Sequence, residues 1–296
     1  MTILWCLILL FFILNGLSFQ RDKIKKMLRA RKKLNCREEN SVKTICCGST
    51  YAWHAFSPNE SDECMVLAYK HQSLQEDFAL LKKYGSKASQ GADVIVALAP
   101  FTTLFRKTKE IGVQRNVYLL NRTEYRDWPM GVYIMNKFFP FVASVIYNVK
   151  EIFIPKDKAP LQNIVMTWKR TFHLVDFNGN NMSAKNQEAI QYNTQVLQQM
   201  VDYCEQKEYH LWIVTVPLTD KLNAVFSDSF TEMTIGSVIG ELRGKFTFLD
   251  YRKDQRFREE NLYGDGCFYL NENGSRAFGQ VLCEDMKRQK CEEACL

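Results

Sequence analysis

The stretch SVKTICCGSTYAWHAF, residues 41–56, decides the fold expected for this chain. It begins with a short run of β-forming residues, stops at Gly48-Ser49-Thr50, and continues with aromatic and small residues. This pattern is typical of a buried strand that ends in a tight turn. Ligands of open α/β sheets bind beyond the carboxyl ends of the strands, so Ser49 stands where a site is expected. The alternative is a Gly-Ser turn with no further role.

Strand and helix patterns alternate along the rest of the chain. Further strands are expected over 63–69, 92–100, 210–217 and 246–250, and helices over 72–84, 183–208, 229–242 and 271–288. The alternation predicts an α/β protein of three layers, α/β/α, with a mostly parallel, five-stranded, flavodoxin-like sheet. Residues from about 101 to 182 lose the pattern. We interpret them as an aromatic helical insertion, whose surface would serve as a lid, a partner groove or ordinary core.

The first residues indicate a membrane anchor. Residues 2–19 carry no charge, and their length suits a marginal membrane span or the core of a signal peptide. Because a basic start and a good cleavage site are both missing, we expect an uncleaved transmembrane helix over 1–20. A basic juxtamembrane segment, 21–36, follows and could also lie on anionic headgroups. The main domain is then expected over 37–289, with a Cys-containing tail over 290–296.

Charge and cysteine usage narrow the function classes. The chain has a formal net charge of +6, but Lys and Arg are concentrated in 21–33, and the rest is close to neutral. A nucleic-acid partner is therefore not expected, because phosphate binding needs a basic face on the domain itself. The chain has no Gly-rich phosphate loop and no zinc-ligand spacing, so neither a cofactor nor a metal is expected. Cys283, Cys291 and Cys295 are candidates for disulfides outside the cell.

Three segments together resemble a known superfamily. They are Gly48-Ser49 after the first strand, QSLQEDFALLKKY at 72–84, and LNENG at 270–274 opening the last helix. In order and spacing they resemble the SGNH (GDSL-like) hydrolases, and more narrowly a bacterial membrane-anchored branch linked to cell-envelope and exopolysaccharide biosynthesis. The resemblance covers roughly 43–286. It implies a serine ester hydrolase or acyltransferase with Ser49 as nucleophile, and a binding site formed by Gly48, Thr50, Gln72, Ser73, Tyr269 and Asn271.

The resemblance breaks at the catalytic base. The superfamily carries Asp-x-x-His shortly before Leu-Asn-x-x-Gly, whereas this chain reads YGDGCFYLN over 263–271. Counting back from Leu270-Asn271 places Tyr269 at the His position, and counting forward from Asp265 places Phe268 there. A Ser hydroxyl is a weak nucleophile without an adjacent base, and Tyr, with a pKa of about 10, is a poor base at neutral pH. The candidates that remain for the catalytic site are His54, His71 and Asp265.

Two functions follow, with a third as background. The first is a catalytically degenerate SGNH-like protein that binds or assembles envelope polysaccharide or acylated glycan, alongside polysaccharide-biosynthesis proteins. The second is an active carbohydrate esterase or O-acyltransferase that uses Ser49 with His54 or His71. The third is a structural membrane protein whose Gly48-Ser49 is only a turn. The resemblance places the domain outside the cytoplasm, whereas the basic cluster would keep it inside, so the two expectations conflict.

Overall fold

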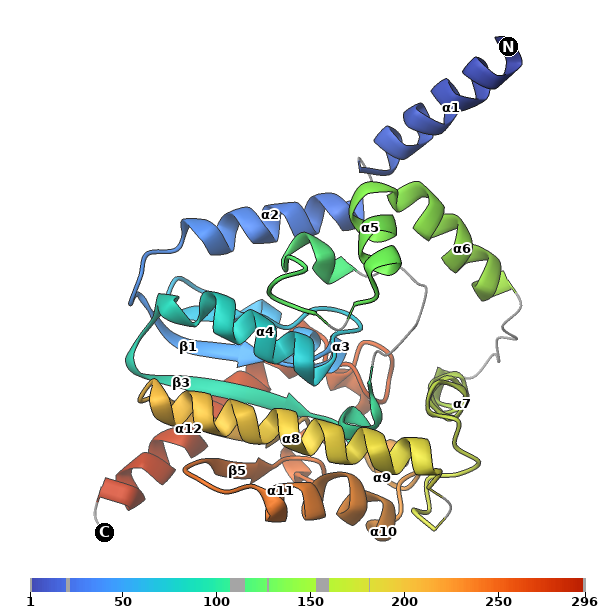
Figure 1. Cartoon of the computed structure of the whole chain (residues 1–296). Coiled ribbons are helices and arrows are strands. Elements are labelled where there is room, and N and C mark those ends of the chain that lie inside the picture. Colours follow the sequence, from blue (N-terminus) through green and yellow to red (C-terminus); the bar gives the residue numbers. More distant parts are fainter. Residues whose placement is uncertain are drawn as a thin grey trace. The chain divides into compact units, whose positions relative to one another are not determined.

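The computed structural model describes residues 2–19, 22–106, 115–126, 128–152, 160–180 and 182–294. The chain forms two compact units. The α/β unit comprises residues 39–81, 85–106 and 157–296, and the helical unit comprises 1–38, 82–84 and 107–156. Figure 1 shows the elements of both.

A parallel sheet of five strands forms the centre of the α/β unit. Its strands are β1 (Val42–Cys47), β2 (Cys64–Val66), β3 (Ala88–Leu98), β4 (His210–Thr215) and β5 (Thr247–Asp250). Their order is β2-β1-β3-β4-β5, and every neighbouring pair is parallel. The expected parallel five-stranded sheet is thus confirmed. The edge strand β2 is shorter than the expected 63–69, because the chain leaves the sheet soon after Leu67, whose amide still donates to Cys46 O.

Helices cover both faces of this sheet, which gives the three layers expected. One face carries α3 (Thr50–Phe56) and α12 (Glu272–Ala294), and the other carries α4 (Leu74–Tyr84) and α8 (Ala184–Gln206) (Figure 1). Side chains alternate between the faces along β1. Cys46 therefore packs in the cluster with α3 and α12, while Cys47 faces Cys204 of α8.

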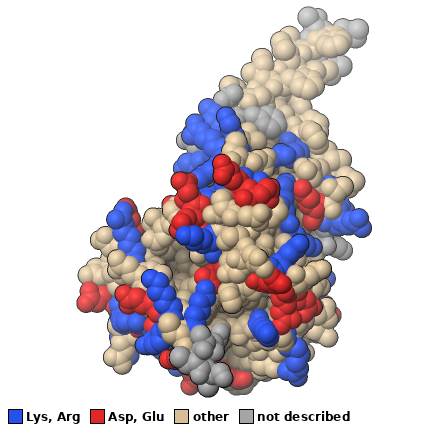
Figure 2. Space-filling view, turned by 90° about the vertical axis from the view of Figure 1, so that its left-hand side faces the viewer, with Lys and Arg blue, Asp and Glu red and all other residues tan. Residues whose placement is uncertain are grey.

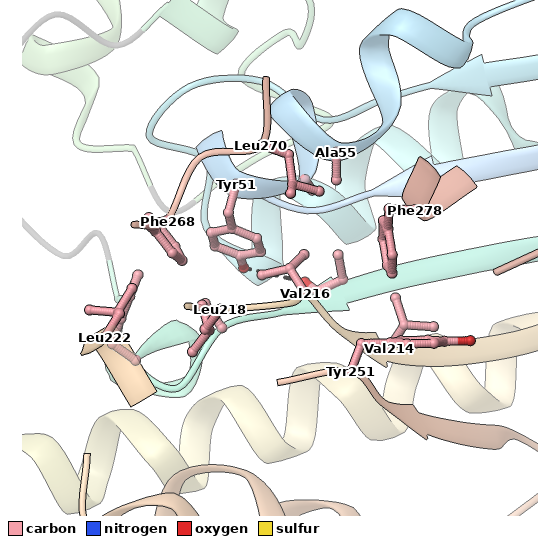
Figure 3. Close-up of a cluster of buried hydrophobic side chains, with 14 of the residues drawn as sticks. Tyr51, Ala55, Val214, Val216, Leu218, Leu222, Tyr251, Phe268, Leu270 and Phe278 are labelled. Carbon is pink, nitrogen blue, oxygen red and sulfur yellow. Dashed lines mark hydrogen bonds between the residues drawn. The ribbon is translucent and has the colours of Figure 1, made fainter. Parts of the chain in front are cut away.

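The α12 side holds a large aromatic and aliphatic core (Figure 3). Phe278 of α12 is fully buried, and its ring lies 5.2 Å from that of Tyr251 and 5.6 Å from that of Phe257. Helix α12 is also tied to α3, since Ser275 Oγ donates to Ala55 O at 2.6 Å across 220 positions of sequence. These contacts close the carboxyl end of β1 against the last helix of the chain.

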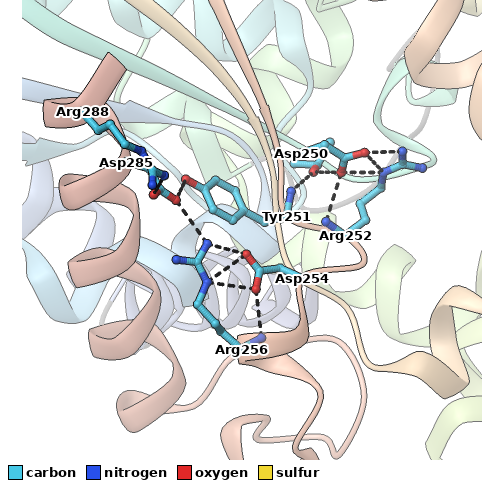
Figure 4. Close-up of polar contacts among 8 residues, drawn as sticks. Asp250, Tyr251, Arg252, Asp254, Arg256, Asp285 and Arg288 are labelled. Atoms are coloured by element: carbon cyan, nitrogen blue, oxygen red, sulfur yellow. Dashed lines mark hydrogen bonds and ion pairs between the residues drawn. The ribbon is translucent and has the colours of Figure 1, made fainter. Parts of the chain in front are cut away.

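A polar network fixes the segment after β5 to α12 (Figure 4). Oδ2 of the buried Asp285 accepts from the Tyr251 hydroxyl at 2.9 Å and from Arg256 Nη2 at 3.2 Å. Asp250, at the end of β5, accepts from Thr215 Oγ1 at 2.6 Å, and Arg252 donates to both of its carboxylate oxygens. Asp250 is therefore fully engaged in holding the strand end.

Short helices complete the α/β unit: α7 (Pro160–Phe172), α9 (Asp220–Asn223), α10 (Asp228–Thr231) and α11 (Ser237–Glu241). The single helix expected over 229–242 is interrupted by a π-helical turn, Glu232–Gly236. Gly236 ends this turn, and glycine weakens a regular helix.

The helical unit contains α1 (Thr2–Phe19), α2 (Asp22–Cys36), α5 (Met130–Phe138) and α6 (Pro140–Ile152). The basic segment expected over 21–36 is helix α2. Its buried residues Ile24, Met27 and Leu34 lie on one helical face, and the helix contacts the 3-10 turn Arg115–Tyr118. The expected insertion is helical but is divided, because α5 and α6 belong to this unit and α7 to the α/β unit.

The N-terminal transmembrane helix expected over 1–20 is not found. Within the described ranges, no helix is both long enough and apolar enough to cross a membrane.

Cys283 and Cys291, two of the three C-terminal disulfide candidates, are free thiols. The third, Cys295, lies outside the described residues.

Candidate functional site

The turn after β1 presents Ser49 as expected. Gly48 has a φ of +138°, and a Cβ there would lie 2.5 Å from that of Ala52, so only glycine fits. Ser49 is the N-terminal capping residue of α3, but its hydroxyl does not cap the helix. Instead, Ser49 Oγ accepts a hydrogen bond from the Gln72 amide at 3.2 Å. The hydroxyl therefore stands at the carboxyl end of β1, partly exposed.

A buried polar network contacts the backbone of this turn. Asp77 and Gln72 are each 1% exposed. Asp77 Oδ1 accepts from the Gly48 amide at 3.1 Å and also from Gln72 Nε2, which in turn donates to Leu67 O at 2.8 Å. Sequence reasoning gave Asp77 no role, although it lies within the 72–84 segment, because its contact with Gly48 spans 29 positions of sequence. Asp77 is thus the main residue that positions the Ser49 turn.

The other predicted binding residues around the turn have local structural contacts. Ser73 caps α4 in a reciprocal capping box with Glu76, and both side chains are buried. Thr50 Oγ1 accepts from the His71 amide at 3.1 Å. His71 has a left-handed backbone, φ +60°, and an exposed side chain. The His71 backbone therefore lies next to the Ser49 turn, while its imidazole is open to solvent.

His54 lies on α3 in a half-buried aromatic group. Its ring is 4.8 Å from the ring of Trp53 and 4.8 Å from that of Tyr269. The Lys70 ammonium lies 5.0 Å above the Trp53 ring. Burial, reinforced by Lys70, lowers the pKa of His54, and the opposing effect of Asp265 does not cancel this. His54 is therefore a neutral imidazole at pH 7.

Asp265, in the loop before α12, has its carboxylate engaged by the backbone. Its Oδ1 accepts from the amides of residues 267, 268 and 269 at 3.2, 2.8 and 2.9 Å. This is the geometry of a side chain that closes its own loop. The charge of Asp265 still acts on His54, so the structure brings these two predicted catalytic residues into the same neighbourhood.

The two positions where the superfamily would have its base are filled by aromatic rings. Phe268 is 2% exposed, with its ring 5.1 Å from Trp168 and 5.7 Å from Phe101. Tyr269 is partly exposed and contacts His54, and burial, followed by the charge of Asp265, raises the pKa of its phenol to about 12. Phe268 is thus part of the hydrophobic core, and Tyr269 carries a phenol that stays protonated at neutral pH.

Asn271, the last predicted binding residue, starts α12. Its Oδ1 accepts from the Gly274 amide at 3.0 Å, and its Nδ2 donates to Asn261 O at 2.5 Å. The first contact satisfies an amide of the first helical turn, as a capping side chain does. The side-chain contacts of Asn271 are therefore those of a helix cap.

Ser49 lacks the proton acceptor that a serine nucleophile needs. Among the described residues, no hydrogen bond joins Ser49 Oγ to an imidazole. His54, the histidine nearest to Ser49 in sequence, lies on another face of the helix: at 100° per residue it is rotated by about 140° around the helix axis from Ser49. Thr50, one turn before His54, shares its face instead. The arrangement presents a hydroxyl and an aromatic group at the same end of the sheet but no linked pair.

A separate cavity of about 430 Å³ lies on the α12 face of the sheet. Cys46, Cys64 and Cys283 are among its lining residues, and Ser49 is not. The Cys46 and Cys64 sulfurs are 4.0 Å apart, and the hydrogen bond between them, together with burial, raises the pKa of Cys46. In the described part of the chain, no three His, Cys, Asp or Glu side chains are grouped to hold a metal ion.

The chain matches no protein-family model and no curated protein sequence. Any assignment of function therefore depends on the residues and the fold described above.

Proposed function

We propose that this chain is an SGNH hydrolase-like protein of cell-envelope polysaccharide metabolism that has lost its catalytic base and acts as a binding or assembly component. The support is a parallel sheet in the order β2-β1-β3-β4-β5, with Ser49 in the turn that follows β1. The ligand in this proposal is an envelope polysaccharide or an acylated glycan. The proposed location of the α/β unit is the outer side of the membrane, as the resemblance implies.

The observation that carries the proposal concerns the position where the resemblance expects the catalytic His, because aromatic residues stand there instead. Phe268 is core, Tyr269 stays protonated, and the Asp265 carboxylate binds three backbone amides. A Ser hydroxyl without an adjacent base does not react at a useful rate with an ester. The half-buried rings of Trp53, His54 and Tyr269 offer an apolar surface with polar edges at the same end of the sheet as Ser49, and such a surface suits the face of a sugar.

A second candidate is the active esterase or O-acyltransferase. One observation favours it: His54 is neutral, as a general base must be, and Asp265 acts on it electrostatically. In this alternative, ligand binding would have to bring Ser49 Oγ within hydrogen-bonding distance of the His54 ring. Hydrogen bonds of catalytic groups often tighten only when substrate is bound.

A fluorophosphonate serine probe separates the two functions. We expect the purified chain, shown to be folded by circular dichroism, to label no more strongly than Ser49→Ala, while a known serine hydrolase labels fully in parallel. Binding of acetylated envelope polysaccharide should persist in Ser49→Ala and weaken in Tyr269→Ala.

Labelling that disappears in Ser49→Ala would overturn the degenerate function. Its further loss in His54→Ala but not in His71→Ala, whose imidazole is exposed, would establish the active alternative with His54 as base.

A further inference from the structure

Helix α1 exposes an apolar surface. It carries no charged residue. Trp5, Leu9, Phe12 and Leu17 are between 60% and 65% exposed, and Ile8, Leu10 and Ile13 between 38% and 50%. At 100° per residue, these positions cover more than half of the helix circumference. Soluble proteins rarely expose apolar side chains over so wide a contiguous area.

The remaining face of α1 is held against α5 and α6. Asn15 is 8% exposed, and its Nδ2 donates to Phe138 O at 2.7 Å, while its Oδ1 accepts from the Phe141 amide at 3.3 Å. The rings of Phe11 and Phe139 are 6.1 Å apart. Helix α1 is therefore fixed by one polar anchor, and its apolar face points away from that contact.

Helix α5 continues the apolar surface. Met130, Ile134 and Phe138 recur every four residues, so they share one helical face. Their side chains are 57%, 40% and 56% exposed. Val145 of α6 is 44% exposed. Because Phe138 is also the residue whose carbonyl binds Asn15, the α5 stripe adjoins α1. The exposed surface thus spans three helices of the helical unit.

Positive charge adjoins this apolar surface. Helix α2 begins at Asp22, close after the end of α1 at Phe19. It buries Ile24, Met27 and Leu34 within the unit, and its exposed residues include Lys26, Arg29, Lys32 and Lys33. Figure 2 shows α1 as a projection without charge and a group of Lys and Arg side chains at its base. An apolar surface beside a basic helix complements an anionic lipid surface.

We propose that the helical unit docks on a bilayer containing anionic lipids. The exposed face of α1 and the Met130, Ile134 and Phe138 stripe contact the acyl chains, and the α2 cations contact the headgroups. Lipid is favoured over a protein partner because the apolar arc of α1 is wider than a groove-bound helix needs, and because the charges stand at one end of it. Docking requires no helix to span the membrane, and it does not depend on the role of Ser49.

Vesicle flotation of the full chain tests this. We expect flotation with phosphatidylcholine vesicles containing 30% phosphatidylglycerol, and weaker flotation with pure phosphatidylcholine or in 0.5 M salt. The double variant Ile134→Asp, Phe138→Asp should lower the partition coefficient at least tenfold. The matched control is Met166→Asp, Val175→Asp in the α/β unit, where the two side chains are 42% and 79% exposed, and it should float like the parent.

The charges of α2 are tested separately. Lys26→Gln and Arg29→Gln should each lower the partition coefficient about fivefold, on the anionic vesicles only.

A spectroscopic readout keeps the test independent of folding differences between variants. Brominated lipids should quench part of the tryptophan fluorescence, and Trp5→Phe should remove that part selectively. The proposal is overturned if the α5 double variant floats as well as the parent, or if Trp5→Phe leaves the quenching unchanged. Ser49→Ala should float like the parent, so failure of docking and failure of the proposed function give different results.

Discussion

The α/β unit and the helical unit differ in how far they expose large apolar side chains. Phe278 and Phe268 of the α/β unit are 0% and 2% exposed, whereas Phe12 and Phe138 of the helical unit are 62% and 56% exposed. Among the described residues, all the large exposed apolar side chains except Met166 and Val175 belong to the helical unit. In the α/β unit nearly all large apolar side chains are buried and stabilise the fold, whereas the helical unit buries some, such as Trp128 and Leu120, and leaves others exposed and available for contact with another phase.

The largest expected effect tests this comparison directly. Phe278→Ala should lower the free energy of unfolding by about 3–5 kcal/mol, because it leaves a cavity among the rings of Phe56, Tyr251 and Phe257. Phe138→Ala, the matched control, should change it by less than about 0.5 kcal/mol. Urea denaturation measures both. Equal losses in the two variants would mean that Phe138 is part of a core, and the comparison would fail.

A smaller effect is expected at the polar network under Ser49. Asp77→Ala removes the acceptor of the buried Gly48 amide and one of the two acceptors of Gln72 Nε2, which still donates to Leu67 O. We expect a loss of about 2–3 kcal/mol in the free energy of unfolding, since each unsatisfied buried donor is costly. Asp202→Ala, which removes an exposed carboxylate bound to Gln198, is the control and should be nearly neutral. A neutral Asp77→Ala would show that Asp77 does not position the turn.

The smallest effect concerns pH. Burial lowers the pKa of His54 in the folded chain below its ordinary value of about 6.5. Between these two pKa values the unfolded chain binds the proton more readily than the folded chain. The parent should therefore lose stability as pH falls below about 6.5, until the folded-state pKa is passed, and His54→Gln should lose less. His210→Gln, at an exposed position, is the control. A His54 resonance that titrates above 6.5 would contradict this prediction.

Much of the α/β unit was predictable because local patterns determine it. The stretch 92–100, apolar except for Asp93, predicts a central strand, and β3 indeed lies between β1 and β4. The helix expected over 72–84 is likewise found, as α4. What the sequence did not predict is tertiary. The division of the insertion between two units depends on contacts between distant helices, such as the one from Asn15 to Phe138.

The position of the candidate site was predictable, but the contacts between its residues were not. A Gly-Ser turn after a β run is a local signal, and Ser49 lies where that signal places it. The partners of the site residues are not local. The Asp77 contact with Gly48 and the contact of the Tyr269 ring with His54 both join segments that only the folded chain brings together. Proximity in sequence also misleads, because Ser49 and His54 are five positions apart yet lie on different faces of α3.

The hydrogen bond from Ser275 to Ala55 has a consequence for biosynthesis. It joins an early helix of the α/β unit to α12, so this part of the packing of α3 cannot form until α12 has left the ribosome. For most of translation the α12 contacts are missing, and contacts between such distant segments form slowly. A nascent chain interrupted before residue 272 would thus expose the side chains that Phe278 and its neighbours later cover. Such a chain is a natural substrate for chaperones and proteases.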